Sequence, residues 1–223
     1  MKLIVLAAGL GSRMRSVTDG RPKQLVEVGG MTLLARHAAM AEAVGMEPVV
    51  VTRPDLVADF RRTGIEVRVE TELTDDMLVT LSNTRRWLRG PYAWVGGDML
   101  IADFAPVREV VEAHFAEEAA ASFLYARTDR FKAKLTFAPR TQVLSTREGS
   151  HPFSVLNFGV HSPRMFSYMP GDLASPGGNY LQRAIEGGEP ILWREYRAAA
   201  FEIDTPADLA AARRHFELLA RAS

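Results

Sequence analysis

Two glycines and a group of basic side chains follow the first apolar run of the sequence. The segment from Gly9 to Lys23 reads GLGSRMRSVTDGRPK and comes directly after LIVLAA. Glycines let the backbone approach a ligand closely and present its N–H groups to an anion. Because the chain holds 27 basic and 27 acidic residues, this local basicity indicates a small anionic ligand rather than a surface for a nucleic acid.

Two familiar phosphate-binding patterns do not fit this segment. The Walker A pattern requires a glycine, four residues and then Gly-Lys-Ser or Gly-Lys-Thr, which the segment lacks. The dinucleotide pattern Gly-x-Gly-x-x-Gly is met by Gly9 and Gly11, but Met14 stands where the third glycine belongs. We therefore predict a loop from Gly9 to Lys23 that binds phosphates, and not a nicotinamide or flavin site.

Two aspartates follow strand-like runs elsewhere in the chain. Asp98 ends YAWVGGD, and Asp204 ends FEID just before the last predicted helix. Mg²⁺ prefers oxygen ligands and commonly takes one or two carboxylates together with phosphates and water. The two aspartates are therefore candidate Mg²⁺ ligands. Asp204 has a second interpretation, because an acidic residue stabilises a helix start without any ligand, and a helix begins near Thr205.

The elements that would position these residues alternate in the first half of the chain. Apolar runs predict strands at 2–8, 47–52, 65–70 and 92–98, and helical spacing predicts helices at 31–44, 54–63, 75–89 and 104–118. Such alternation is typical of a parallel sheet covered by helices. We predict an α/β fold: a three-layer α/β/α Rossmann-like arrangement around a mixed, mostly parallel sheet. Ligands of such sheets bind beyond the carboxyl ends of the strands, where the glycine-rich loop begins.

The second half of the chain has a different pattern. Strand-like runs at 119–127, 132–139, 141–147 and 154–161 are separated by turn signals, which predicts a small antiparallel flap at roughly 120–160. A last helix should begin at DTPADL, with Thr205 as its N-cap and Pro206 in its first turn. No linker or repeat divides the sequence, so we expect a single domain over residues 1–223.

The composition excludes several classes of protein. The chain has no cysteine, and therefore no disulfide, thiol nucleophile or cysteine metal site. No run approaches the ~20 apolar residues of a membrane span. The N-terminal KLIVLAAGL begins like a signal peptide, but glycines and arginines interrupt it. We expect a soluble cytoplasmic protein, monomeric or homodimeric, that binds neither membranes nor nucleic acid.

The loop LAAGLGSRM…T…PKQL resembles the signature of nucleotidyltransferases in the nucleotide-sugar pyrophosphorylase superfamily. The aspartates of VGGD and FEID are similar to the metal-binding positions of that family. The resemblance implies an Mg²⁺-dependent enzyme whose substrates are a nucleoside triphosphate and a small phosphorylated acceptor. The acceptor phosphate would attack the α-phosphorus and release pyrophosphate, which requires positioning and charge stabilisation but no general base.

The resemblance also implies a role for individual residues. Arg13, Lys23 and Asp98 would be catalytic, and Asp98 and Asp204 would hold the metal. The implied nucleotide-binding residues are Leu6, Ala7, Ala8, Gly9, Gly11, Ser12, Asp76, Thr80 and Gly97. The implied acceptor-binding residues are Asn157, Gly159 and Tyr180. Arg15 and Arg21 have no implied role, and none of the five histidines is expected to be catalytic.

The choice of nucleotide and acceptor depends on weaker resemblances. The GTAGA-like turn and VEKP segment of sugar-phosphate enzymes are not visible, whereas TDDMLVTLSNTRRWL resembles a helix start of phosphocholine-type cytidylyltransferases. This favours CTP with a phosphorylated alcohol such as phosphocholine, or a phosphonate. Alternatives are a sugar-1-phosphate uridylyl- or guanylyltransferase, a molybdopterin-type enzyme, whose loop usually ends in Gly-x-Asp-Lys, and a nucleotide-binding regulator without catalysis.

Two further groups could contact the acceptor. A cationic acceptor would need an aromatic cage, for which the candidates are Tyr92, Trp94, Tyr125, Tyr180 and Trp193. Aromatic residues at strand and helix spacing more often belong to the core. Lys132 and Lys134 could reach the acceptor phosphate from the flap, or could simply be lysines of an edge strand.

Overall fold

The computed structural model describes residues 1–9, 11–70, 77–128, 134–137, 143–145, 153–169 and 180–222. The segments 134–137 and 143–145 are described by their backbone alone. The predicted nucleotide-binding residue Asp76 and the predicted phosphate contact Lys132 lie outside the described residues, as does the Lys134 side chain.

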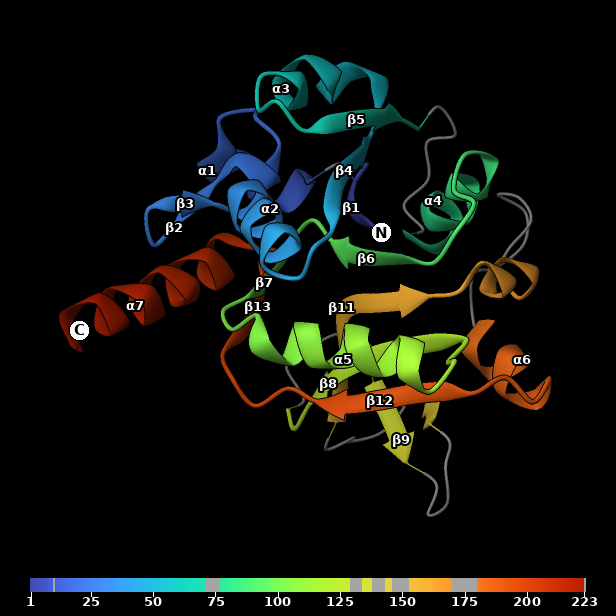
Figure 1. The fold of residues 1–223 in the computed structure, drawn as a ribbon. Coiled ribbons are helices and arrows are strands. Elements are labelled where there is room, and N and C mark those ends of the chain that lie inside the picture. The colour runs from blue at the N-terminus through green and yellow to red at the C-terminus, as the bar shows by residue number, and fades with distance from the viewer. Residues whose placement is uncertain are drawn as a thin grey trace.

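A nine-stranded mixed sheet forms the centre of the molecule (Figure 1). Its first part consists of four parallel strands: β1 (Lys2–Ala7), β4 (Glu47–Thr52), β5 (Glu66–Val69) and β6 (Tyr92–Gly96). β1 lies between β6 and β4, and β5 follows β4. The apolar runs of β1 and β6 are buried on both faces, as parallel strands covered by helices require.

Helices cover both faces of this sheet. Two core clusters lie on opposite sides of the same strands: Leu3 and Val5 face one, and Ile4 and Leu6 face the other. The first cluster is covered by α2 (Leu33–Ala43), α3 (Val57–Arg61) and α5 (Ala105–Ala116), and the second by α4 (Met77–Asn83) and α6 (Tyr180–Glu186). The predicted three-layer α/β/α fold is confirmed.

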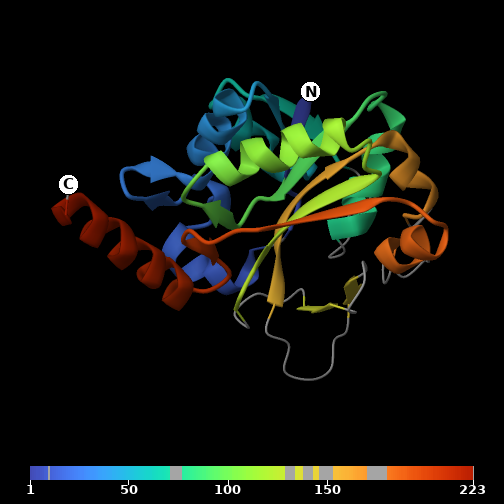
Figure 2. The same cartoon turned by 60° about the horizontal axis from the view of Figure 1, so that its bottom comes forward.

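The antiparallel strands follow β6 on one side of the sheet. They are β8 (Ala121–Ala126), β9 (Lys134–Phe137), β10 (Val143–Ser145) and β11 (Phe153–His161), and β12 (Ile191–Glu195) runs parallel to β8. β11 pairs with β6 so that Phe158 lies opposite Val95 and His161 lies opposite Tyr92. In Figure 2 the short strands β9 and β10, in yellow, lie on the side of the sheet away from α5.

Two small two-stranded sheets were not predicted from the sequence. β2 (Glu27–Val28) pairs with β3 (Met31–Thr32), and β7 (Met99–Ile101) pairs with β13 (Ala200–Glu202), both antiparallel. The β7–β13 pair joins segments that are far apart in the sequence. It leads directly into α7 (Pro206–Ala222), which extends away from the body of the molecule in Figure 1. No helix among the described residues is long and apolar enough to span a membrane.

The prediction of a loop throughout Gly9–Lys23 is wrong in part. The segment contains a 3₁₀ turn at Ser12–Met14 and one helical turn, α1 (Arg15–Thr18). Gly11 starts the turn with a left-handed φ of 59°, which favours glycine. Met14 is buried in a third core cluster with Ile203, so an apolar anchor folds the segment into turns.

Candidate active site

A cavity of about 540 Å³ opens at the carboxyl ends of β1 and β6. Most of the residues implied by the sequence line it. Its lining includes the implied catalytic, metal-binding and acceptor-binding residues Arg13, Lys23, Asp98, Asp204 and Asn157. It also includes the implied nucleotide-binding residues Leu6, Ala8, Gly9, Gly11, Ser12, Thr80 and Gly97. The cavity lies where an open α/β sheet is expected to bind its ligand.

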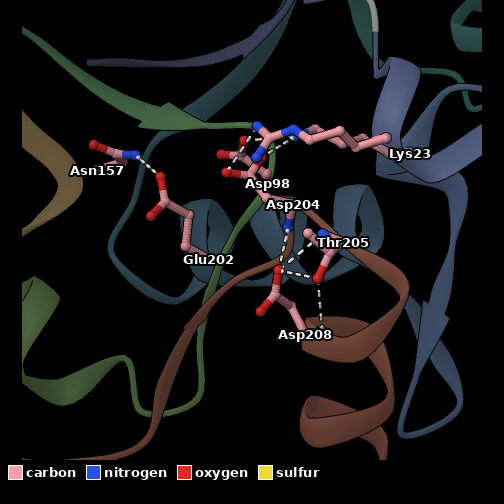
Figure 3. A network of polar contacts seen from close by, with 8 residues as sticks. Lys23, Asp98, Asn157, Glu202, Asp204, Thr205 and Asp208 are labelled. Carbon is pink, nitrogen blue, oxygen red and sulfur yellow. Dashed lines mark hydrogen bonds and ion pairs between the residues drawn. The ribbon is translucent and has the colours of Figure 1, made fainter. Parts of the chain in front are cut away.

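Two carboxylates meet at a single lysine in this cavity. The Lys23 ammonium donates to Asp98 Oδ2 at 2.6 Å and to Asp204 Oδ1 at 3.1 Å (Figure 3). The Arg13 guanidinium reaches Asp204 Oδ2 at 3.2 Å. The Lys23 and Asp204 side chains are only 13% and 9% exposed, whereas Arg13 is 58% exposed at the cavity mouth. The cluster therefore has a shielded centre and one cation that remains accessible to a ligand.

The β7–β13 pairing explains how Asp98 and Asp204 come together. Asp98 immediately precedes β7, Asp204 follows β13, and Ile203 N donates to Asp98 O at 2.9 Å. The other interpretation of Asp204, as the residue that caps α7, is not needed. Thr205 and Asp208 form that cap: Asp208 Oδ2 accepts from Thr205 N at 2.8 Å, and Asp208 N donates to Thr205 Oγ1 at 3.3 Å.

Gly97 directly follows β6 and lies at the cavity, against the end of the neighbouring strand β1. Its N–H donates to Leu6 O at 2.9 Å. A Cβ atom at Gly97 would lie 2.6 Å from Leu6 O and 2.7 Å from Gln24 Nε2, so the site has no room for a side chain. Gln24 is buried and lines the cavity, but it was not among the site residues implied by the sequence. The signal was its place directly after Lys23 in the quoted PKQL.

A second polar pair lies in the cavity beside the charged cluster. Asn157 Nδ2 donates to Glu202 Oε1 at 3.1 Å, and both residues are part of the cavity lining. In Figure 3 this pair lies to one side of Asp98 and Asp204. Glu202 was also missed from the sequence. It stands two positions before Asp204, so the alternation of a strand was a signal that both face the same side.

A family model described as a MobA-like NTP transferase domain matches residues 3–221 of the chain. The protein belongs to this family. The match covers the glycine-rich loop, both aspartates and the Asn157–Glu202 pair. The predicted likeness to nucleotide-sugar pyrophosphorylases is confirmed at the level of the fold, while the phosphocholine cytidylyltransferase branch remains a prediction.

Relatives of this MobA-like domain include two curated enzymes. The chain is 29% identical over 110 residues to N-acetylmuramate alpha-1-phosphate uridylyltransferase of Neisseria meningitidis, a match that covers 45% of the chain and 48% of that enzyme. It is 26% identical over 142 residues to mannose-1-phosphate guanylyltransferase 1 of Arabidopsis thaliana, covering 58% of the chain and 39% of the enzyme. The chain thus matches less than half the length of either enzyme.

A solved structure resembles the MobA-like domain over nearly its whole length. It is the inositol-1-phosphate CTP transferase from T. maritima, with a TM-score of 0.77 and 21% sequence identity. The similarity covers 98% of this chain and 94% of that one. At this level of identity the likeness establishes a shared fold.

Among the implied site residues that the structure describes, three do not line the cavity. Ala7 is buried in the core cluster on the other face of β1. Gly159 lies beneath the Trp94 ring, because a Cβ there would be 2.8 Å from Trp94 Nε1. Tyr180 is buried, with its hydroxyl 3.4 Å from His161 Nε2. Gly159 and Tyr180 thus contribute to an aromatic cluster around His161.

The aromatic cluster comprises His161, Tyr92, Trp94, Phe123 and Tyr180. Burial lowers the pKa of His161 from 6.5 to about 3, and burial raises the pKa of Tyr180. Trp94 Nε1 donates to His161 Nε2 at 3.2 Å. Tyr92, Trp94 and Tyr180 therefore belong to the core and not to a cage around a ligand, although the resemblance implied that Tyr180 contacts the acceptor.

The donor set of the MobA-like domain fits a magnesium ion. Asp98 and Asp204 supply carboxylate oxygens, and both already contact one cationic nitrogen. Within the described part of the chain, no three His, Cys, Asp or Glu side chains gather as a metal site. Mg²⁺ commonly binds one or two carboxylates and takes its remaining ligands from phosphates and water, so a pair is sufficient.

Proposed function

We propose that this protein is an Mg²⁺-dependent nucleotidyltransferase. It transfers a nucleoside monophosphate from a nucleoside triphosphate to the phosphate of a small acceptor and releases pyrophosphate. One observation carries the proposal: Arg13, Lys23, Asp98 and Asp204 meet in a cavity that is also lined by the glycine-rich loop after a parallel strand. Cations and metal-binding carboxylates at a phosphate-binding edge are the requirements of phosphoryl-group chemistry.

The reaction forms one bond and breaks one bond at the α-phosphorus. An oxygen of the acceptor phosphate attacks in line, and the bridging oxygen between the α- and β-phosphates departs with pyrophosphate. The acceptor phosphate is already ionised near neutral pH, so no side chain has to remove a proton. This agrees with the burial of His37, His114 and His161 in the core, where their pKa values are lowered mainly by burial.

Each charged residue of the cavity has a distinct part in this proposal. Asp98 and Asp204 would hold Mg²⁺, which screens the triphosphate and stabilises negative charge during transfer. Arg13, at the cavity mouth, neutralises the departing pyrophosphate. Lys23 contacts the reacting phosphates, and the backbone around Gly9 and Gly11 binds the nucleotide.

Two candidate substrate pairs follow from different observations. CTP with a phosphorylated alcohol or phosphonate is favoured by the TDDMLVTLSNTRRWL segment and agrees with the fold neighbour that is an inositol-1-phosphate CTP transferase. UTP or GTP with a sugar 1-phosphate is favoured by the uridylyl- and guanylyltransferases among the curated relatives. A regulator without catalysis would not need the contacts that join Lys23 to two carboxylates.

The test is pyrophosphate release by the purified protein with Mg²⁺. ATP, CTP, GTP and UTP are each paired with phosphocholine, glucose 1-phosphate, mannose 1-phosphate, N-acetylmuramate 1-phosphate and inositol 1-phosphate. Release that requires both a nucleotide and an acceptor supports the proposal and identifies the base. A protein that binds nucleotides but releases no pyrophosphate with any pair would contradict it and favour the regulator.

A further inference from the structure

A buried histidine lies directly behind the segment that carries Asp98. His37 belongs to α2, which packs against β7 (Figure 1), and only 2% of this residue is exposed. Its Nε2 lies 2.7 Å from the carbonyl oxygen of Met99, the residue that follows Asp98. A carbonyl oxygen only accepts hydrogen bonds, so His37 Nε2 must carry the hydrogen and donate it. His37 therefore holds the backbone one residue away from a proposed metal ligand.

The β7–β13 pairing turns the Met99 carbonyl away from β13. Met99 lies opposite Glu202 in this pair of strands. The carbonyl before it, that of Asp98, accepts a hydrogen bond from Ile203 N at 2.9 Å. Residue pairs in an antiparallel ladder alternate between those that exchange hydrogen bonds and those that do not. Because Asp98 belongs to a bonded pair, Met99 belongs to a pair without ladder bonds, and its carbonyl is free to face α2.

Two consecutive carbonyls of this segment are therefore held by two different elements. β13 holds the carbonyl of Asp98, and α2 holds the carbonyl of Met99 through His37. Met99 is fully buried, so the loss of His37 would remove the donor from a carbonyl that water does not reach. Together the two bonds restrict rotation of the backbone that carries the Asp98 carboxylate. Since Asp204 follows β13, they also restrict where Asp98 lies relative to Asp204.

The second ring nitrogen indicates that His37 does more than fill the core. Burial lowers the pKa of His37, so the ring is neutral, and the hydrogen on Nε2 leaves Nδ1 as an acceptor. Nδ1 is buried and receives no hydrogen bond from any described residue. A buried polar atom without a partner costs free energy that a leucine in the same place would avoid. The observation that requires a histidine here is therefore its bond to the Met99 carbonyl.

We propose that His37 is a positioning residue of the metal site. Its Nε2–H, acting through the Met99 carbonyl, fixes Asp98 at the place where it shares a metal ion with Asp204. This inference rests on the proposed nucleotidyl transfer. His37 is not part of the cavity lining, so it contacts neither substrate nor metal and is not a catalytic residue. Groups that orient the ligands of a metal nevertheless control metal affinity without touching the ion.

His114 provides a matched control on the same face of the sheet. It belongs to α5, which like α2 covers the first core cluster, and it is also 2% exposed. Its Nδ1 lies 2.9 Å from Ser122 Oγ, its Nε2 lies 3.3 Å from Ser162 Oγ, and it is not part of the cavity lining. Replacing either histidine removes buried polar contacts and should lower stability. Of the two, His37 is the one that contacts the segment after Asp98.

The experiment compares the wild type with His37→Leu, His37→Gln and His114→Leu. Leucine fills a similar space without a donor, whereas the glutamine amide can place an N–H close to the position of the histidine Nε2. Urea unfolding measures the stability of each protein. The rise of Tm with Mg²⁺ alone measures metal binding without turnover. Pyrophosphate release with the best pair of nucleotide and acceptor, per folded molecule, gives the acceptor KM and the Mg²⁺ concentration for half-maximal rate.

We expect His37→Leu to raise two Mg²⁺ concentrations about 10-fold: that for half-maximal rate and that for half of the Tm rise. The acceptor KM should stay within about twofold, because the acceptor does not depend on this contact. His37→Gln should bring both Mg²⁺ concentrations back to within about threefold of the wild type, since it keeps a donor to Met99. His114→Leu should lose stability while both Mg²⁺ concentrations stay at the wild-type values.

The possible failures are distinguishable. Absence of pyrophosphate release by the wild type with every pair would contradict the proposed function, while the Mg²⁺ dependence of Tm would still test the role of His37. Lower stability of His37→Leu with wild-type Mg²⁺ concentrations would make His37 a structural residue and overturn the inference. Equal Mg²⁺ effects in His114→Leu, or no recovery in His37→Gln, would also overturn it. Should His37→Leu not fold, His37→Met replaces it, because methionine adapts to irregular spaces and also lacks the donor.

Discussion

The same face of the β6–β11 pair carries two very different groups of polar residues. At one end, His161 lies opposite Tyr92 and Gly159 lies opposite Trp94, and the buried side chains seal this end from the surface. At the other end, the register leads to Asn157 opposite Gly96, and Asp98 follows at the cavity. Both groups occupy alternate positions of the same strands.

The comparison shows that placement along a strand decides what a polar residue does. Both ends use a glycine to admit large or charged neighbours: Gly159 makes room for Trp94, and Gly96 for Asp98 and Asn157. In the sealed cluster, Trp94 Nε1 donates to His161 Nε2, which leaves the hydrogen of the neutral ring on Nδ1 to donate to the Tyr92 hydroxyl. At the open end, charges face a cavity that can admit water and ligand.

The largest expected effect is at the open end. We expect Asp98→Asn and Asp204→Asn each to lower kcat for pyrophosphate release about 100-fold to 1,000-fold, because each removes a charged ligand of the proposed metal. Asp103→Asn is the control, since Asp103 accepts a hydrogen bond from Ala105 N at the start of α5 and is not part of the cavity lining. Rates near the wild type for either cavity variant would contradict the metal assignment.

The two glycines allow the ends to be compared directly. Gly96→Ala should lower kcat about 100-fold by displacing Asp98 and Asn157, since a misplacement of about 1 Å is that costly. Gly159→Ala should instead destabilise the fold by about 1–3 kcal/mol, because its Cβ would lie 2.8 Å from Trp94. Urea unfolding would measure the loss of stability, and turnover per folded molecule would measure the loss of activity. Equal losses of activity in the two variants would contradict the proposed difference between the two ends.

Lys23 links charge balance to stability at the open end. Lys23→Met should lower turnover roughly 10-fold to 100-fold by removing one charged contact to the reacting phosphates. It also leaves Asp98 and Asp204 without the ammonium they share. Added Mg²⁺ should therefore raise Tm more in Lys23→Met than in the wild type, with Lys2→Met, on the distant Glu66 pair, as the control. If Mg²⁺ raised Tm equally in the three proteins, the Lys23 ammonium and Mg²⁺ would not occupy the same position.

The smallest effect concerns the sealed end and appears as a pH slope. Burial lowers the pKa of folded His161 from 6.5 to about 3, so between these values the unfolded chain binds a proton that the folded chain does not. Stability must therefore fall as pH decreases below 6.5, by ~1.4 kcal/mol per pH unit for this histidine. Urea unfolding at several pH values should give a shallower dependence for His161→Phe. His114, whose pKa is about 4 because of burial, adds to the slope in both proteins.

The sequence predicted the features that depend on residues close to one another along the chain. Buried runs gave β1, β4, β5 and β6, and the loop motif placed Arg13 and Lys23 at the sheet edge where the cavity lies. The capping pattern of Thr205 and Asp208 was also readable, because its partners are three residues apart.

The missed features depend on contacts between distant segments. β7 and β13 are three residues each, too short to show a periodicity. The resemblance implied that Asp98 and Asp204 lie together, but only the β7–β13 pairing shows how they meet. Glu202 became visible as a cavity residue for the same reason. Tyr180 was expected at the acceptor, but its partner His161 lies on β11, and no spacing along the chain indicates that contact.

The β7–β13 pair also has a consequence for the order in which the protein is made. Asp204 is synthesised 181 residues after Lys23, when the strands of the parallel part of the sheet have already left the ribosome. Until then Lys23 can meet Asp98 but not the second carboxylate. A nascent chain that has folded its central sheet would thus still lack half of the proposed metal site, and nucleotide transfer would begin only after β13 has paired with β7.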